Sequence, residues 1–422
     1  MGVEFKRKKE VMALLQARGN GKVKVIEGLR QVGKSYLLKT LFHRELLRLG
    51  VKEEEIAVLD FLMDEDEIRD APSLKAKVRE LLKGGEVAYL FMDEVQMVEG
   101  YGEALKTLHC QNPGVDIYVT GSNSRTLSKD IEREIGAEET YEILLRPLSF
   151  AQIREDWPSF SFEDYFSLGG IPKVLLAESE AKRREIFISL YRDTYVKDIL
   201  ARSDGLLNIG ENEKRMIVQR IFDTTSTGVS LKSIAKEINA DNRAENKSST
   251  AIHADVDTFF ERLLDSFLFE RMGEDSSEAK KGRKGHIENR GKCYCEDLGL
   301  LRFASRSYDL DSDALEDAVF LHLLSKGLSP VCLKFDYFDP LIHEECKNRE
   351  IDFYCEKDGE SYLIQVALAL YGGNAYQREV HNLLFAKREG RKMLVYLSDN
   401  SIDHPDADSI EFVPAEDFLL SF

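Results

Sequence analysis

Short apolar segments alternate with amphipathic segments in the first third of the chain. The apolar segments lie at residues 22–28, 55–62, 87–92 and 115–120. Residues 34–50 carry apolar side chains at helical spacing. Short buried strands that alternate with helices are typical of a parallel sheet with helices on both faces. The pattern therefore predicts an α/β core over residues 1–150.

The pattern changes beyond this core, and the length of 422 residues leaves room for further domains. Residues 151–210 mix prolines, aromatic residues and a Gly-Gly turn, which predicts a helical lid. Residues 211–310 contain segments of helical periodicity followed by strand-like segments, the order of a winged helix. Residues 311–422 contain helices, strands and a hairpin turn at Asp358-Gly359, which predict a second α/β domain.

A glycine-rich segment follows the first apolar run, with the spacing Gly28-x-x-x-x-Gly33-Lys34-Ser35. A strand, a glycine loop and a helix in this order bind phosphates through backbone N–H groups and the helix N-terminus. The lysine would place its charge on the outer phosphates, and the serine hydroxyl would bind Mg²⁺. The residues expected to bind ATP are Gly28, Leu29, Arg30, Gln31, Val32, Gly33, Lys34, Ser35, Tyr36 and the more distant Asp93.

Two acids, Asp93 and Glu94, end the apolar run at 87–92. The carboxyl end of a buried parallel strand is where open α/β sheets bind ligands. Asp93 and Ser35 are expected to bind Mg²⁺, and Glu94 to take a proton from the attacking water. Ser122 and Asn123 follow the next strand and are expected to contact the terminal phosphate or the water. The predicted catalytic residues are Glu94, Lys34, Ser122 and Asn123.

Composition limits the other functions. The net charge of −18 disfavours long-range attraction of nucleic acids, although it leaves room for a local basic patch. The six cysteines contain no C-x-x-C spacing, which favours reduced thiols in the cytoplasm over a zinc site. No apolar run approaches the ~18 residues of a membrane span, so no membrane partner is expected.

The chain contains, in this order, the segments GLRQVGKSYLL, YLFMDEVQ, IYVTGSNS, LRPLSFAQI, FSLGGIPKVLL and YRDTYVKDIL. Together they resemble those of a bacterial and archaeal group of AAA-like P-loop ATPases. That group carries a winged-helix segment and a C-terminal domain similar to restriction endonucleases. The resemblance covers nearly the whole chain, and it implies ATP binding and Mg²⁺-dependent hydrolysis.

One position departs from the pattern of this group, which often has Gly-Arg shortly before the segment PLSF. Here Gly136 is followed by Ala137. An arginine that neutralises transition-state charge can be worth a factor of ~10³ or more. Arg125, Arg133 or Arg146 is a substitute within the chain, and a neighbouring subunit of an oligomer is another source.

The C-terminal region contains part of an endonuclease-type constellation, in which carboxylates hold Mg²⁺ and a lysine acts beside them. Glu316 on a helix and Asp352 on a strand match its first two positions, but Gln365 and Ala367 stand where an acid and a lysine are expected. The region is therefore interpreted as a degenerate endonuclease-like domain that binds a partner, such as a protein, rather than an active nuclease.

A basic stretch at 278–292 is the candidate contact with nucleic acid, together with the winged helix. Its cationic residues are Lys280, Lys281, Arg283, Lys284, Arg290 and Lys292. A contact with the phosphate backbone and a solvated loop between two strands both account for this composition.

The favoured function is that of an ATPase that couples its nucleotide state to movement of the C-terminal domains. The alternative is a nucleotide-switched regulator that binds nucleic acid or protein and turns over rarely. An ATP-gated nuclease is less favoured because of the missing acid and lysine.

Overall fold

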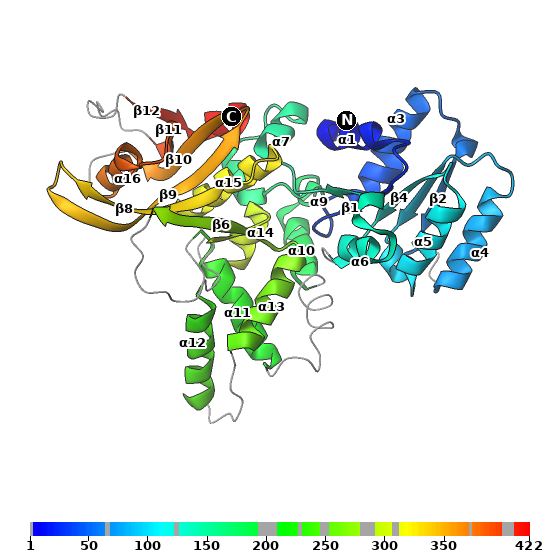
Figure 1. Cartoon of the computed structure of the whole chain (residues 1–422), viewed down its shortest axis with the longest axis horizontal. Helices are drawn as coiled ribbons and strands as arrows, with labels where there is room; N and C mark the ends of the chain where they lie inside the picture. The colour runs from blue at the N-terminus through cyan, green and yellow to red at the C-terminus, as the bar shows by residue number, and fades with distance from the viewer. Residues whose placement is uncertain are drawn as a thin grey trace. The chain divides into compact units, whose positions relative to one another are not determined.

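The computed structural model describes residues 3–63, 68–121, 126–192, 209–226, 230–244, 253–278, 292–305, 312–370, 374–398 and 409–422. The chain divides into two compact units (Figure 1). The first unit comprises residues 1–147, 171–202 and 265–267, and the second comprises 148–170, 203–264 and 268–422.

The first unit is built on a five-stranded parallel sheet with the order β2-β3-β4-β1-β5. Its strands are β1 (Val23–Glu27), β2 (Ile56–Asp60), β3 (Tyr89–Asp93), β4 (Asp116–Thr120) and β5 (Thr140–Leu144). All five residues of β1 are buried, as expected of a strand that is paired on both sides and covered on both faces. The parallel sheet predicted for this region is confirmed.

Alternate residues of the strands form a core on each face of this sheet. On one face, Val25, Leu59 and Met92 pack in a single cluster with residues of α4, α5 and α6. On the other face, the Phe42 ring lies 4.9 Å from the ring of Tyr118. The helices of the unit are α1 (Lys8–Ala17), α2 (Lys34–Tyr36), η1 (Leu37–Phe42), α3 (His43–Arg48), η2 (Glu53–Glu55), α4 (Ala71–Leu82), η3 (Val95–Met97), α5 (Tyr101–Gln111), α6 (Thr126–Ile135), η4 (Ala137–Glu139), α9 (Pro172–Leu175) and α10 (Glu180–Tyr191).

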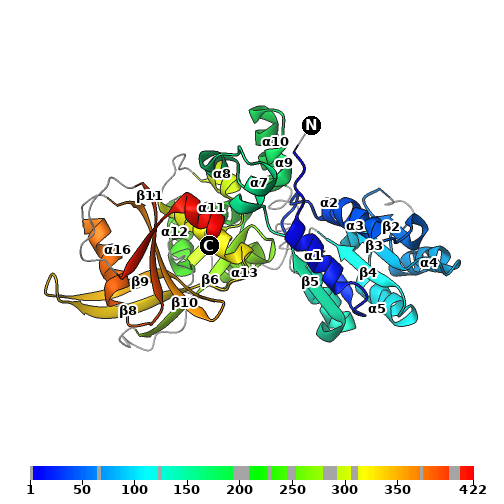
Figure 2. The same ribbon diagram turned by 90° about the horizontal axis from the view of Figure 1, so that it is seen from above.

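The second unit contains a seven-stranded mixed sheet with the order β12-β11-β10-β9-β8-β6-β7. Its strands are β6 (Phe269–Glu278), β7 (Lys292–Cys295), β8 (Val331–Asp339), β9 (Glu344–Lys357), β10 (Glu360–Ala369), β11 (Arg391–Ser398) and β12 (Ile410–Pro414). Positive φ angles of 53° at Asp358 and 81° at Gly359 join β9 to antiparallel β10. The predicted hairpin turn is confirmed, and α16 (Asn374–Phe385) packs against strands β8 to β11 (Figure 2).

The remaining helices belong to the second unit. They are α7 (Phe150–Asp156), α8 (Phe162–Leu168), α11 (Glu211–Asp223), α12 (Leu231–Ala244), α13 (His253–Asp265), α14 (Leu298–Ala304), α15 (Ser312–Ser325) and α17 (Ala415–Ser421). The Gly170 N–H donates to the Asp297 carboxylate that begins α14, at 2.7 Å. The segment 151–210, predicted as a lid, is thus divided between the units, with α7 and α8 in the second and α9 and α10 in the first.

The order predicted for the winged helix is present as three helices, α11 to α13, followed by the antiparallel hairpin of β6 and β7. Strand β6 also pairs with β8, from Gly273 opposite Val331 onward. The hairpin is therefore continuous with the large sheet, and the winged-helix assignment itself stays a prediction. The basic residues at 279–291 lie outside the described residues.

Candidate nucleotide-binding site

The loop between β1 and α2 has a backbone that glycine makes possible. Gly28 has φ of +144°, and a Cβ at this position would lie 2.1 Å from the Leu145 carbonyl oxygen. Gln31 and Gly33 also have positive φ, of 64° and 101°. Repeated positive φ angles fold the loop tightly, and this is the kind of backbone that forms anion-binding nests.

The side chain of Lys34 lies inside this loop. It is buried, and its Nζ donates to the carbonyl oxygens of Gly28 at 2.8 Å and Leu29 at 2.9 Å. Burial lowers the pKa of Lys34 to about 8, although Glu94 counters part of that effect. A buried cation that donates to neutral carbonyls is matched well by an added anion.

Asp93 lies at the carboxyl end of β3, where three side chains donate to it. Its Oδ1 accepts hydrogen bonds from Ser35 Oγ at 2.9 Å and Thr120 Oγ1 at 2.5 Å. Its Oδ2 lies 2.6 Å from Lys39 Nζ, which also lies 2.5 Å from Asp60 Oδ2. Although burial opposes it, the hydrogen bonds to Asp60 and Asp93 raise the pKa of Lys39.

Glu94 follows in a left-handed conformation, with φ of 60°. Its N–H donates to Thr120 Oγ1 at 3.0 Å, and its Oε2 accepts from Gln96 Nε2 at 2.5 Å. Non-glycine residues with positive φ are uncommon and are often found at functional sites. Thr120 therefore fixes both acids, because one hydroxyl donates to Asp93 and accepts from the backbone of Glu94.

The side chains of this site fit the Mg²⁺ ion and the phosphate group that the sequence implies. Ser35 and Asp93 place a hydroxyl and a carboxylate oxygen 2.9 Å apart, and oxygen ligands are those that Mg²⁺ prefers. The adjacent buried ammonium of Lys34 suits a phosphate. The structure thus places Lys34, Ser35, Asp93 and Glu94 at one edge of the sheet, as the sequence predicted.

Other predicted residues lie differently. Leu29 and Val32 are buried, whereas Tyr36 is 44% exposed and its hydroxyl donates to Glu4. Ser122 and Asn123 lie outside the described residues.

The arginine candidates are divided as well. Arg125 lies outside the described residues. Arg133 is exposed on α6 and pairs with Asp130 at 3.0 Å. The Arg146 backbone carbonyl accepts from Arg7 Nη1, and Arg7 Nη2 donates to the Val32 carbonyl of the glycine loop. None of these contacts identifies an arginine finger.

Sequence reasoning missed Thr120, Lys39, Asp60 and Gln96. Thr120 and Asp60 end strands that neighbour β3, so their positions carried a signal once the sheet order was known. Lys39 lies in η1, a π-helical segment, and such segments are frequent at functional sites.

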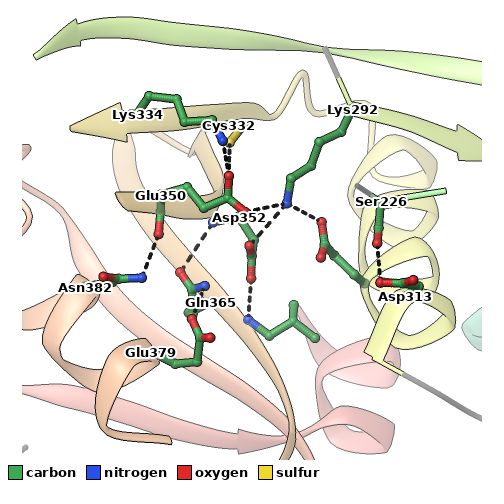
Figure 3. Close-up of polar contacts among 12 residues, drawn as sticks. Ser226, Lys292, Asp313, Cys332, Lys334, Glu350, Asp352, Gln365, Glu379 and Asn382 are labelled. Carbon is green, nitrogen blue, oxygen red and sulfur yellow. Dashed lines mark hydrogen bonds and ion pairs between the residues drawn. The ribbon is translucent and has the colours of Figure 1, made fainter. Parts of the chain in front are cut away.

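A second polar cluster lies in the other unit, around the residues predicted as a degenerate nuclease site (Figure 3). Glu316 and Asp352 are brought together there, and Gln365 lies beside them with its Oε1 3.4 Å from the Asp352 backbone nitrogen. Ala367 stands at the lysine position of the motif, so the sequence predicted a cluster without a lysine. That prediction was wrong, because a lysine from another strand lies in the cluster. Lys292 of β7 reaches the cluster, 2.7 Å from Glu316.

This placement also corrects one residue of the predicted nucleic-acid contact. Lys292 is 7% exposed and lies among carboxyl groups rather than in a solvated loop. The partner prediction for the rest of 280–292 stays a prediction. Among the described residues, no three His, Cys, Asp or Glu side chains are arranged to hold a metal ion.

Comparison with known families gives a match in the N-terminal third of the chain. Residues 20–154 match the AAA domain family. This match and the parallel sheet support an AAA-like P-loop core in this part of the chain. None of the described helices is long and apolar enough to cross a membrane.

Relatives extend over most of the chain. An uncharacterized protein of Haemophilus influenzae is 26% identical over 425 residues, which is 98% of each chain. An uncharacterized protein of Methanocaldococcus jannaschii is 23% identical over 386 residues, 86% of this chain and 79% of that protein.

Two solved structures show distant likeness. A Walker-type ATPase of Pyrococcus abyssi is 13% identical, with a TM-score of 0.48 over 71% of this chain and 96% of that one. The ORC2 protein of Aeropyrum pernix is 12% identical, with a TM-score of 0.41 over 63% and 87%.

Proposed function

We propose that this protein is an Mg²⁺-dependent ATPase of the AAA type. The observation that carries the proposal lies at the carboxyl ends of β1, β3 and β4. The Thr120 hydroxyl bonds Asp93 and the Glu94 backbone, Ser35 donates to Asp93, and Lys34 lies in the glycine loop. A phosphate-binding cation, oxygen ligands for a divalent ion and a general base are the groups that phosphoryl transfer to water requires.

Each side chain has a distinct task in this proposal. Lys34 offsets the charge of the terminal phosphates, and Ser35 and Asp93 hold Mg²⁺, which neutralises charge that develops on the phosphate oxygens. Glu94 accepts a proton from the attacking water as the new oxygen–phosphorus bond forms and the bond to the ADP oxygen breaks. Thr120 holds the Asp93 carboxylate and the Glu94 backbone in fixed positions relative to each other.

The contacts of the two acids favour slow basal turnover. Asp93 Oδ2 is held by Lys39 and Glu94 Oε2 is held by Gln96. Both contacts must adjust when the acids take up their catalytic partners. Coupling of the nucleotide state to movement of the C-terminal domains is part of the proposal, supported by the family resemblance.

Steady-state phosphate release from the wild type and from Glu94→Gln tests the proposal, with ATP affinity measured for both. We expect the substitution to abolish turnover and to leave binding within about threefold, because the amide keeps the size of the acid but accepts no proton. ATP binding without turnover in both proteins would favour the nucleotide-switched regulator. Turnover that survives in Glu94→Gln would contradict the assigned base.

A further inference from the structure

Charged side chains from three elements of the second unit meet at one buried point (Figure 3). Lys292 comes from β7, Glu316 from α15, and Glu350 and Asp352 from β9. The Lys292 Nζ lies 2.7 Å from Glu316 Oε1, 3.2 Å from Glu350 Oε1 and 3.4 Å from Asp352 Oδ1. The lysine and Asp352 side chains are 7% and 6% exposed, so the pairs are screened little by water.

The lysine matches this environment in the number of its donors. An ammonium carries three N–H donors, and three carboxyl groups surround it. Although burial opposes it, Asp352, Glu316 and Glu350 raise the pKa of Lys292, so the ammonium stays charged. Burial, with Asp352 nearby, raises the pKa of Glu316 to about 8.

The second oxygens of Asp352 and Glu350 also have partners within the protein. Asp352 Oδ2 accepts from the Val366 N–H at 2.9 Å, and Glu350 Oε2 pairs with Lys334. The Tyr294 hydroxyl donates at 2.7 Å to Glu316 Oε1, the same oxygen that Lys292 contacts.

Gln365, which takes the place of the usual third acid, is also occupied. Its Nε2 donates to Glu379 Oε2 at 2.6 Å, and Arg378 holds the other oxygen of Glu379. The Gln365 amide nitrogen is therefore bonded to the ion pair of Glu379 and Arg378. The resemblance to endonuclease-type domains implies a divalent cation among these groups. The residues present do not fit one, because a lysine ammonium stands where the carboxyl groups converge.

We propose that Lys292 replaces the divalent cation of an endonuclease-type site. The ammonium is a resident cation that binds β7 to α15 and β9, and the cluster takes up no divalent metal while the lysine is in place. The end of the basic stretch is thereby anchored in the sheet. In this proposal the acids keep the arrangement of a metal centre, and the Lys292 ammonium supplies the positive charge that a metal ion would supply.

Manganese, a paramagnetic probe for such sites, tests this replacement in the full chain without nucleotide. Free Mn²⁺ is measured by electron paramagnetic resonance, and stability is measured by thermal unfolding. For the wild type we expect the same Mn²⁺ binding as for Asp352→Asn. For Lys292→Met, which keeps the length but removes the charge, we expect a fall in Tm on the order of 10 °C. Millimolar Mn²⁺ should reverse part of that fall.

Two further variants keep the test decisive. Lys292→Met/Asp352→Asn removes one uncompensated acid, so it should unfold at a higher temperature than Lys292→Met and should lose the Mn²⁺ response. Lys334→Met is the matched control, since it removes a lysine paired with Glu350 but leaves Lys292 in place, and it should bind no more Mn²⁺ than the wild type. If Lys292→Met does not fold, the double variant and the Mn²⁺ titration of the wild type still test the proposal.

Two results would overturn the proposal. One is a wild-type protein that binds Mn²⁺ stoichiometrically through Asp352, which would make the cluster a true metal site. The other is a folded Lys292→Met variant with the stability of the wild type and no response to Mn²⁺.

Discussion

Replacement of Thr120 by valine tests whether one hydroxyl organises the two acids of the nucleotide site. Thr120 is fully buried, and its hydroxyl donates to Asp93 at 2.5 Å and accepts from the Glu94 N–H at 3.0 Å. A hydrogen bond to a charged group contributes about 1.5–3 kcal/mol, and an orphaned buried N–H costs about 1–3 kcal/mol. Since Ser35 and Lys39 still bind Asp93, we take the lower part of the sum, about 3 kcal/mol.

For a unit of this size, that loss lowers the unfolding temperature by roughly 6–12 °C. Misplaced acids should also lower kcat by about 100-fold while ATP binding changes far less. Thermal unfolding and steady-state phosphate release measure the two effects.

Thr140→Val is the matched control on β5 of the same sheet. The Thr140 hydroxyl donates to the Ala137 carbonyl at 3.1 Å. Its loss should cost about 1 kcal/mol and leave turnover unchanged. The reasoning fails if Thr120→Val is no less stable than Thr140→Val and its kcat stays within twofold of the wild type.

Three further changes probe the same unit. Gly28→Ala forces a Cβ to within 2.1 Å of the Leu145 carbonyl oxygen at a φ of +144°; we expect ATP binding to be lost and Tm to fall, and unchanged calorimetric binding would contradict the loop geometry. Burial raises the pKa of Glu27 to about 8, so the protonated native acid stabilises the unit at low pH. That contribution is lost as pH rises from the unfolded value near 4.5 through 8. Thermal unfolding at pH 6 and pH 9 should therefore show a smaller difference for Glu27→Gln than for the wild type, and equal differences would refute the assignment. Lys39 competes with a metal ion for Asp93 Oδ2, so Lys39→Met should lower the Mg²⁺ concentration that gives half-maximal ATP turnover; a higher requirement would show that Lys39 assists instead.

The nucleotide site was predictable because its signals are local. Lys34 and Ser35 lie in one loop, and Asp93 and Glu94 follow one buried strand, so pattern and motif are sufficient to place them. The hairpin turn at Asp358-Gly359 was predictable for the same reason, since positive φ at adjacent residues restricts the residue types.

The contacts of Lys39 and Lys292 were not predictable because they depend on tertiary structure. Lys39 lies in a π-helical segment and contacts Asp93 of β3 and Asp60 of the neighbouring strand β2. Lys292 ends a basic stretch that resembles a solvated loop, and only the pairing of β7 with β6 brings it to acids up to 60 residues further along the chain. The sequence therefore identified Lys292 as a cation but did not predict that its partners are buried carboxyl groups.

The most direct test of the account is a calorimetric titration of a non-hydrolysable ATP analogue with Mg²⁺ into the wild type and into Lys34→Ala. The buried ammonium lies inside the glycine loop, so its charge-assisted contact with a phosphate should contribute about 2–3 kcal/mol. We predict saturable binding with one site per chain in the wild type and affinity weaker by about 30–150-fold in Lys34→Ala. Absence of heat in the wild type, or equal affinity in both proteins, would contradict the nucleotide site.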